Sequence, residues 1–334
     1  MIARFEKSRR YRPLLALGLA AGGLLGLAQP ASADEGGASV YLLGSGGPGT
    51  AIMPPVKGVF FSNTLYYYSG EAGGDKQFPI GGSVVADLNA AITADFATVL
   101  WVPSTDFAGG TLALGATLPV GEVDIDVSGV ISGPAGGGVG VSRNDSAFVV
   151  GDPLVTALLG WSKGNYHLQV GAMVNLPIGD YRKDELANLA FHRWAADTSV
   201  AATWHDPASG WDVSGKAGVT FNGTNEHTDY NSGNDFHAEL AVEKAFSKAF
   251  SAGVQLYHFR QISDDSGSGA RLGAFKGKAS GVGVTAAWNF QLAERPATLR
   301  LRAFTEFDVE NRLEGDSIFL DFSIPLVMKL PTAP

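Results

Sequence analysis

The chain has 334 residues, no cysteine, and 33 acidic against 24 basic side chains, for a formal net charge of −9. This acidic balance argues against a nucleic acid as a partner, because phosphate backbones are bound by clustered lysine and arginine. Without cysteine, the chain has neither disulfide bonds nor thiolate metal ligands.

Residues 1–33 have the composition of a secretory signal peptide. The basic stretch MIARFEKSRRYRP precedes the apolar stretch LLALGLAAGGLLGLA, and Ala31-Ser32-Ala33 has the pattern of a cleavage site. The apolar stretch is short and broken by glycines, so an uncleaved membrane anchor is disfavoured. We therefore predict cleavage near Ala33.

Residues 34–56 are rich in glycine and include Pro54-Pro55, so no long regular element is expected there. They form either a periplasmic tail or a plug that enters the rest of the fold. Residues 57–334 form the main domain. No apolar run after the signal is long enough for a membrane helix.

The main domain alternates apolar and polar residues with a period of two, which is typical of β-strands. In Thr298–Glu310, for example, Leu299 and Leu301 alternate with Arg300 and Arg302. We predict about twelve strands, at 57–69, 82–102, 110–130, 147–162, 165–179, 193–205, 210–223, 235–246, 249–262, 279–292, 297–309 and 316–327. The strand at 110–130 changes phase near Gly121, where a bulge would keep one face apolar.

Alternation alone does not show which face points inward, because a soluble barrel buries its apolar set and a membrane barrel exposes it. The connections alternate in length, which is the outer-membrane pattern. Those near 163–164, 206–209, 247–248 and 293–296 are short, and those at 131–146, 180–192, 224–234 and 263–278 are long and polar. An even strand count places both termini at the short-turn rim, which is then periplasmic.

Tryptophans gather at corresponding strand ends, as expected at a membrane interface. Only Trp194 lies near the long loops, and Trp101 points inward if its strand alternates regularly; those near the short turns are Trp101, Trp161, Trp204, Trp211 and Trp288. These features predict an all-β protein, a transmembrane antiparallel β-barrel of about twelve strands in the bacterial outer membrane.

Several stretches of the chain resemble a known family of outer-membrane proteins assigned to the meta-cleavage pathway of phenol degradation. They are YLLGSGG, GVFFSNTLYYYSG, GDPLVTALLGWSKGNYHLQVGAMVNLPIGDY, LANLAFHRW, DPASGWDVSGKAGVTFNGTNEHTDYNSGNDFHAEL, DSGSGARLGAFKGKASGVG and FDVENRLEGDSIFLDFSIPL. The resemblance implies an outer-membrane barrel with a role in uptake of hydrophobic or aromatic compounds. The chain is also distantly similar to larger channels for fatty acids and aromatic hydrocarbons, which have more strands.

The face opposite the apolar set carries many charges, and a wet lumen holds them at lower cost than a dry core. The predicted lumen-lining residues are Asp87, Asp95, Glu122, Asp124, Asp126, His167, Asp212, Lys216, His237, Glu239, Arg300, Arg302, Glu306 and Asp308. They form either a structural ion-pair network, which we favour, or a polar pore wall. In the loop 264–278, Asp265, Arg271 and Lys276 are candidates for a gate, although a solvated surface loop is slightly preferred.

Catalytic motifs are absent from the sequence: it has no G-x-S-x-G, H-E-x-x-H or P-loop pattern. An enzyme with an active site at the rim would use the loop-side histidines and their neighbours, which are His192, His227, His258, Asp197, Asp229 and Ser263. A calcium site at Asp264-Asp265 or around Asp229 lacks the EF-hand spacing, so no metal site is predicted.

The predicted function is passive uptake of small hydrophobic or aromatic compounds, by diffusion through the lumen or by lateral exit through the wall. The expected partners are outer-membrane lipid, the solute and the barrel-assembly machinery. No nucleic acid, cofactor or catalytic residue is expected. A rim enzyme and a structural or adhesive barrel without transport remain as alternatives.

Overall fold

The computed structural model describes residues 37–80, 83–132, 138–271, 273 and 276–329, and the predicted signal peptide lies outside them. The strands are β1 (Lys57–Ile80), β2 (Ser83–Phe107), β3 (Gly110–Ser132), β4 (Gly138–Val150), β5 (Leu154–Lys163), β6 (Tyr166–Asn175), β7 (Ala195–Asp206), β8 (Trp211–Asn222), β9 (Thr224–Asn225), β10 (Tyr230–Asn231), β11 (Asn234–Ala245), β12 (Phe250–Gln261), β13 (Lys278–Leu292), β14 (Arg295–Glu310) and β15 (Glu314–Lys329). None of the described segments is a helix long and apolar enough to cross a membrane.

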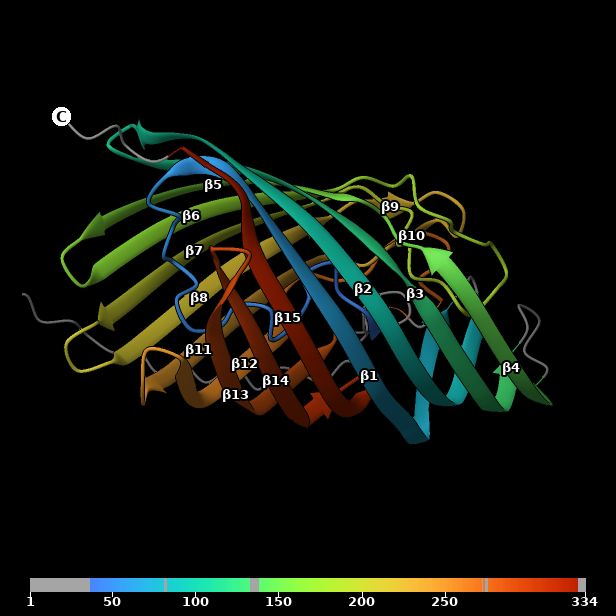
Figure 1. The fold of residues 1–334 in the computed structure, drawn as a ribbon. Coiled ribbons are helices and arrows are strands. Elements are labelled where there is room, and N and C mark those ends of the chain that lie inside the picture. Colours follow the sequence, from blue (N-terminus) through green and yellow to red (C-terminus); the bar gives the residue numbers. More distant parts are fainter. Residues whose placement is uncertain (1–36, 81–82, 133–137, 272, 274–275, 330–334) are drawn as a thin grey trace, which may run out of the picture.

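The large sheet closes on itself as an antiparallel barrel (Figure 1), because β1 pairs with β2 on one side and with β15 on the other. β4 and β5 together fill one strand position in the wall, because they pair with successive parts of β3. β4 pairs with Val120–Ser132, and β5 pairs with Thr111–Thr117. Twelve strand positions therefore complete the ring, as the sequence predicts. β9 and β10 form a separate small hairpin in a loop.

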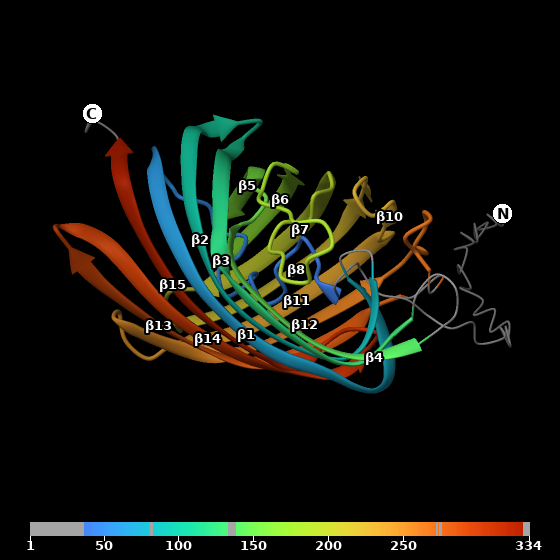
Figure 2. The same ribbon diagram turned by 90° about the vertical axis from the view of Figure 1, so that its right-hand side faces the viewer.

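The barrel wall is uneven in height. β1, β2 and β3 have 24, 25 and 23 residues, whereas β5 and β6 have 10 each. The long strands extend well beyond the rest of the wall at the long-loop end (Figures 1 and 2). Beside β4 the loop 176–194 takes the place of a strand, because β6 already ends at Asn175.

The outer face of the wall carries an apolar belt. The inner face behind it is largely polar on β7 to β14, whereas Met53, Val102 and Ala113 form an apolar cluster beside β2 and β3. On adjoining strands, Val254 and Val284 are 54% and 61% exposed, while their neighbours Gln255 and Thr285 are buried. A soluble barrel would have the opposite arrangement. The predicted orientation, with the apolar face toward lipid, is therefore confirmed.

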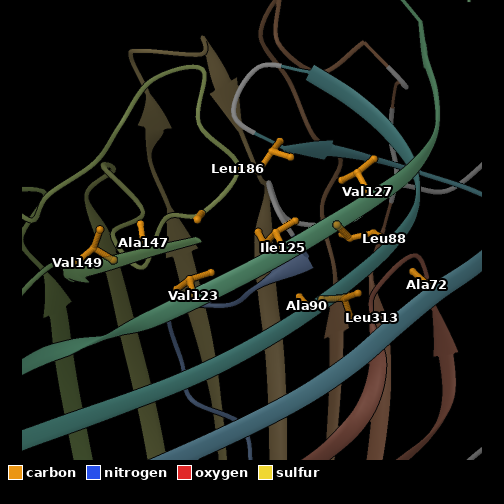
Figure 3. Packing of buried hydrophobic residues seen from close by; sticks show 11 residues of the cluster. Ala72, Leu88, Ala90, Val123, Ile125, Val127, Ala147, Val149, Leu186 and Leu313 are labelled. Carbon is orange, nitrogen blue, oxygen red and sulfur yellow. The ribbon is translucent and has the colours of Figure 1, made fainter. Parts of the chain in front are cut away.

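The phase change in β3 has a different cause from the predicted bulge. The register between β2 and β3 is continuous past Gly121. Val123 and Ile125 belong to a buried apolar cluster on the inner side, toward Leu186 and Leu313 (Figure 3). The strand keeps its alternation, and the inner face becomes apolar where β3 rises above the shorter strands.

This arrangement corrects the prediction that three acidic residues of β3 line the lumen. Glu122, Asp124 and Asp126 alternate with the buried cluster residues of β3, so they lie on the outer face. Above the apolar belt, an outer face in contact with water carries charges at no desolvation cost.

The faces of β2 are likewise the reverse of those predicted. Leu88, Ala90 and Ala94 are buried inside, so Asp95 lies on the outer face, where it accepts a hydrogen bond from the side-chain amide of Asn63. Trp101 shares this outer face and is 52% exposed. The prediction of an inward Asp95 was therefore wrong, and the expected inward Trp101 points outward.

Candidate functional site: the barrel lumen

The N-terminal segment, residues 37–56, runs along the inside of the barrel (Figure 2). Gly37 lies next to Arg312 on the long-loop side. Farther along, the backbone amides of Gly49 and Ala51 donate to Asp212 and Thr203, over 3.1 and 3.2 Å. The segment therefore spans the lumen from one rim toward the other, along the course of the plug proposed from sequence.

Tyr41 is the aromatic side chain of this segment and is buried. Its hydroxyl donates to Glu239 over 2.8 Å, and the amide of Gly44 donates to the same oxygen over 3.0 Å. The ring stacks on His237 with centroids 3.6 Å apart, and the Lys216 ammonium lies 4.6 Å from the ring centroid. Three of the predicted lumen residues thus surround one tyrosine.

Two arginines of β14 are paired with carboxylates inside the lumen. Arg302 makes two hydrogen bonds of 2.8 and 2.7 Å to Asp321 and also donates to the carbonyl of Gly44. Arg300 pairs with Glu243. These contacts support the structural interpretation of the predicted charges, because each guanidinium has a carboxylate partner that offsets its desolvation.

A buried histidine–aspartate pair completes this polar zone. His237 and Asp197 lie 2.8 Å apart, and Thr220 donates to the same carboxylate oxygen. Nearer the short turns, Asp212 accepts from Ser214 over 2.6 Å, and His167 contacts the hydroxyl of Ser162 over 2.8 Å.

Above the polar zone, toward the long loops, the lumen contains an apolar cavity of about 210 Å³. Its floor is the N-terminal segment from Val40 to Leu43, and its walls come from the tall strands and the loop 176–194. Most of the lining side chains are apolar or aromatic; they include Ile92, Phe96, Val123, Ile125, Leu186, Leu189 and Phe191. Such a cavity suits an apolar ligand better than an ion.

Glu306, a predicted lumen residue, lies at the wall of this cavity. It accepts hydrogen bonds from the hydroxyls of Tyr68 and Tyr257, over 3.0 and 2.9 Å, and from the amide of Gly315 over 3.1 Å. Its charge is thereby shared among three donors, so the carboxylate fixes two aromatic rings of the cavity wall.

Asp152, in the break between β4 and β5, holds both ends of the loop 176–194. It is 2% exposed and accepts from the amides of Gly179, Phe191 and His192, each over 2.9 Å. Asn175 donates to it as well, over 3.0 Å. One carboxylate thus ties down the loop that closes the wall beside the cavity.

The middle of the same loop is held by β4. The Asp145 carboxylate accepts from the amides of Leu186 and Ala187, over 2.7 and 3.0 Å, and Arg143 pairs with Glu185. The sequence analysis missed Asp145 and Asp152 as site residues. Asp145 falls in the predicted loop 131–146, Asp152 falls in the predicted strand 147–162, and neither belongs to a recognisable motif.

The loop histidines considered for catalysis do not assemble with the expected partners. His192 and His227 face each other, with ring centroids 4.1 Å apart, whereas His258 contacts Ser280 over 2.9 Å. Asp229 binds Ser268, and Asp197 binds His237. Within the described part of the chain, no three potential metal ligands of the His, Cys, Asp and Glu types come together.

The remaining predicted residues lie near the long-loop rim. Asp265 is buried and accepts from the hydroxyl of Tyr230 over 2.6 Å, Lys276 pairs with Asp264 over 2.7 Å, and Arg271 is exposed. Asp308 is 53% exposed at its side chain and pairs with Lys278, so it does not line the lumen as predicted. Asp87 has a φ of 51°, and no hydrogen bond joins its side chain to another described residue.

The closed ring, the apolar outer face and the polar zone within define a β-barrel of the outer-membrane type. The chain belongs to the family described as "Putative MetA-pathway of phenol degradation", whose model matches residues 73–322. No curated protein matches the chain in sequence.

One of the solved structures that match this chain has the same fold. An outer membrane channel from Pseudomonas putida F1 aligns with a TM-score of 0.65 at 20% identity, over 84% of this chain and 99% of that one. The β domain of the Bordetella autotransporter BrkA aligns at 0.44 and 11% identity, over 81% and 100% of the two chains. A Pseudomonas aeruginosa FadL homologue aligns at 0.40 and 10% identity, over 83% and 93%.

Proposed function

We propose that this protein is an outer-membrane channel for passive uptake of small hydrophobic or aromatic compounds, with both termini on the periplasmic side. The apolar cavity inside the barrel carries the proposal. An apolar solute gains free energy by leaving water for such a surface, whereas a hydrophilic solute loses hydration there. Uptake down a gradient needs no energy coupling, and no nucleotide-binding motif occurs in the sequence.

The volume of the cavity sets the size of the solute. An engineered apolar cavity of about 150 Å³ holds benzene. The cavity of about 210 Å³ in this barrel therefore accommodates a single ring with a small substituent. A solute of this size fits the family to which the chain belongs, whose description names phenol degradation.

The N-terminal segment favours lateral exit over passage through the whole lumen. Below the cavity, Tyr41 and Gly44 are hydrogen bonded to Glu239, and Arg302 is bonded to Asp321 and Gly44. An apolar solute offers no substitute for these bonds. Beside the cavity, the loop 176–194 forms part of the wall in place of a strand.

A pair of adjacent substitutions tests the proposal. Ala90 is buried in the cavity wall, and Ala91 is its neighbour on the outer face of β2. We expect Ala90→Phe to fill the cavity and to abolish the protein-dependent uptake of labelled toluene by cells, and Ala91→Phe to leave it unchanged. Cells without the protein give the background, and heat-modifiable migration in gels confirms folding of both variants.

The proposal predicts no protein-dependent entry of a hydrophilic sugar. Toluene uptake that is equal with and without the protein contradicts the proposed function. Equal uptake by the wild type and Ala90→Phe contradicts the assignment of the cavity as part of the route.

A further inference from the structure

Several polar groups around the apolar cavity are occupied by other parts of the protein. Glu306 accepts from Tyr68, Tyr257 and Gly315, and Asp152 accepts from the ends of the loop 176–194. The amide of Asn188 donates to the carbonyls of Arg182 and Glu185 within its own loop. These groups shape the cavity, and their hydrogen bonds are already used.

Tyr66 is different. It lines the cavity from β1, and its ring lies between two phenylalanines, with centroid distances of 4.8 Å to Phe319 and 6.3 Å to Phe96. Within the described part of the chain, its hydroxyl has no hydrogen-bond partner, in contrast to the hydroxyls of Tyr68 and Tyr257. A polar group in an apolar cavity costs free energy while it is unpaired, unless water or a ligand reaches it.

A second hydroxyl lies on the same wall. Ser317 also lines the cavity and has no hydrogen-bond partner among the described residues. It pairs across β1 and β15 with Tyr68, two positions from Tyr66, while Tyr66 pairs with Phe319. Diagonal neighbours in a sheet lie about 7–8 Å apart, within reach of one small ring. The wall thus offers aromatic faces together with a polar spot.

We propose that the Tyr66 hydroxyl is a specificity site of this cavity, which selects a single aromatic ring that bears a hydroxyl group over the same ring without one. The inference rests on the proposed function and adds the chemical class of the solute. The ring of a phenol packs among Tyr66, Phe96 and Ile92, which line the cavity, and its hydroxyl exchanges a hydrogen bond with that of Tyr66. A methyl-substituted ring of nearly the same size leaves the Tyr66 hydroxyl unpaired.

Tyr67 provides a matched control. It follows Tyr66 in β1 but lies on the outer face, where it is 44% exposed. Tyr66→Phe and Tyr67→Phe each remove one oxygen from the same strand. The first variant keeps the aromatic packing of the cavity and changes only its polar spot. The second leaves the cavity unchanged.

The experiment is a binding titration by fluorine NMR with the full barrel in lipid nanodiscs. The two probes are 4-fluorophenol and 4-fluorotoluene, and nanodiscs without protein correct for partition into lipid. We expect Tyr66→Phe to weaken binding of 4-fluorophenol about three- to tenfold, the range of one neutral hydrogen bond. Binding of 4-fluorotoluene stays as in the wild type, and Tyr67→Phe affects neither probe.

Each other outcome overturns a separate step. Unchanged 4-fluorophenol binding by Tyr66→Phe, or equal weakening of both probes, contradicts the specificity site and leaves the proposed function standing if both probes still bind. If the wild-type protein binds neither probe more than empty nanodiscs do, the result contradicts the proposed function itself, because the cavity then does not bind such solutes.

Discussion

The hydroxyl of Tyr41 donates a 2.8 Å hydrogen bond to Glu239, which lies 198 residues later in the chain. This bond joins the N-terminal segment to the middle of the barrel wall. Because the Lys216 ammonium lies over the Tyr41 ring and Glu239 also accepts from Gly44, the segment is held by charge-assisted contacts at one point.

The first prediction concerns this anchor. Glu239→Gln removes the charge, and a hydrogen bond to a charged group contributes about 1.5–3 kcal/mol. We expect the segment to leave the lumen more often, so that ion conductance through a planar bilayer increases and fluctuates. A variant that lacks residues 37–56 sets the open level. Glu310→Gln, on the exposed end of β14, serves as the control.

If conductance of Glu239→Gln equals that of the wild type while the deletion variant conducts more, Glu239 is not the anchor. An unchanged conductance in the deletion variant contradicts the role of the segment as a plug.

The second prediction concerns Asp152 and the loop 176–194. Asp152→Asn replaces one acceptor oxygen by a donor that faces other donors, so at least one amide at the loop ends loses its partner. We expect the loop to open more easily by about 1–3 kcal/mol. Hydrogen exchange measured by mass spectrometry reports the change as faster exchange at Gly179, Phe191 and His192.

The matched control for this loop is Asp180→Asn. Asp180 pairs with Arg182 at the surface, where an ion pair contributes little. Exchange that is equally fast in both variants shows that Asp152 has no special role. If hydrogen exchange in Asp152→Asn equals that of the wild type, Asp152 does not hold the loop in place.

The third prediction is a pH dependence of the contact between the loops 176–194 and 223–233. Burial lowers the pKa of His192 below its ordinary value of 6.5, and the neighbouring His227 lowers it further, while Asp152 and Glu226 raise it. The packed loop therefore binds fewer protons than the open loop. The contact is fully stable above about pH 6.5 and weakens as the pH falls below that value.

Hydrogen exchange of residues 181–192, corrected for the intrinsic effect of pH, measures this loosening between about pH 8 and about pH 5. His192→Phe keeps an aromatic ring next to Tyr181 and removes the titrating group, so the pH dependence should decrease in this variant. A dependence that persists unchanged in His192→Phe assigns the effect to another group.

The sequence pattern predicted the barrel well because every strand that contacts lipid must have apolar residues on its lipid-facing side. Alternation in Thr298–Glu310 separated an apolar from a polar face, the loop lengths and tryptophans indicated that the apolar face points outward, and Arg302 lies inside as expected. The charges that surround Tyr41 were also predicted to face the lumen. The place of the N-terminal segment was left open between a periplasmic tail and a plug, because a glycine-rich segment carries no periodicity that shows where it lies.

The errors have a common origin in the height of the wall. Residues 131–146 were predicted as a loop, yet the ends of β3 and most of β4 lie there. Likewise β1 continues to Ile80, beyond the predicted end at residue 69. Where a strand extends beyond the bilayer, its outer face contacts water and its inner face lines an apolar cavity. The apolar and polar residues therefore exchange faces, and in the sequence this exchange resembles a bulge or a loop.

The cavity itself could not be predicted from one sequence. Tyr66 and Ser317 lie on the first and last strands of the ring, and the loop residue Leu186 comes from its other side. Only closure of the ring brings these three together. Asp152 was missed for a related reason: its hydrogen bonds go to loop amides, whose positions depend on the tertiary fold.

The unbroken run of β3 from the apolar belt into water gives a single strand two opposite substitution rules. On the outer face, lysine is costly near Leu114, whereas near Ile125 it is tolerated on the outer face and costly on the inner face. Along such a strand, the outward-facing residues are apolar where the strand contacts lipid and polar where it contacts water. A topology method that ends each strand where its apolar outer face ends will therefore predict strands that are too short in proteins of this shape.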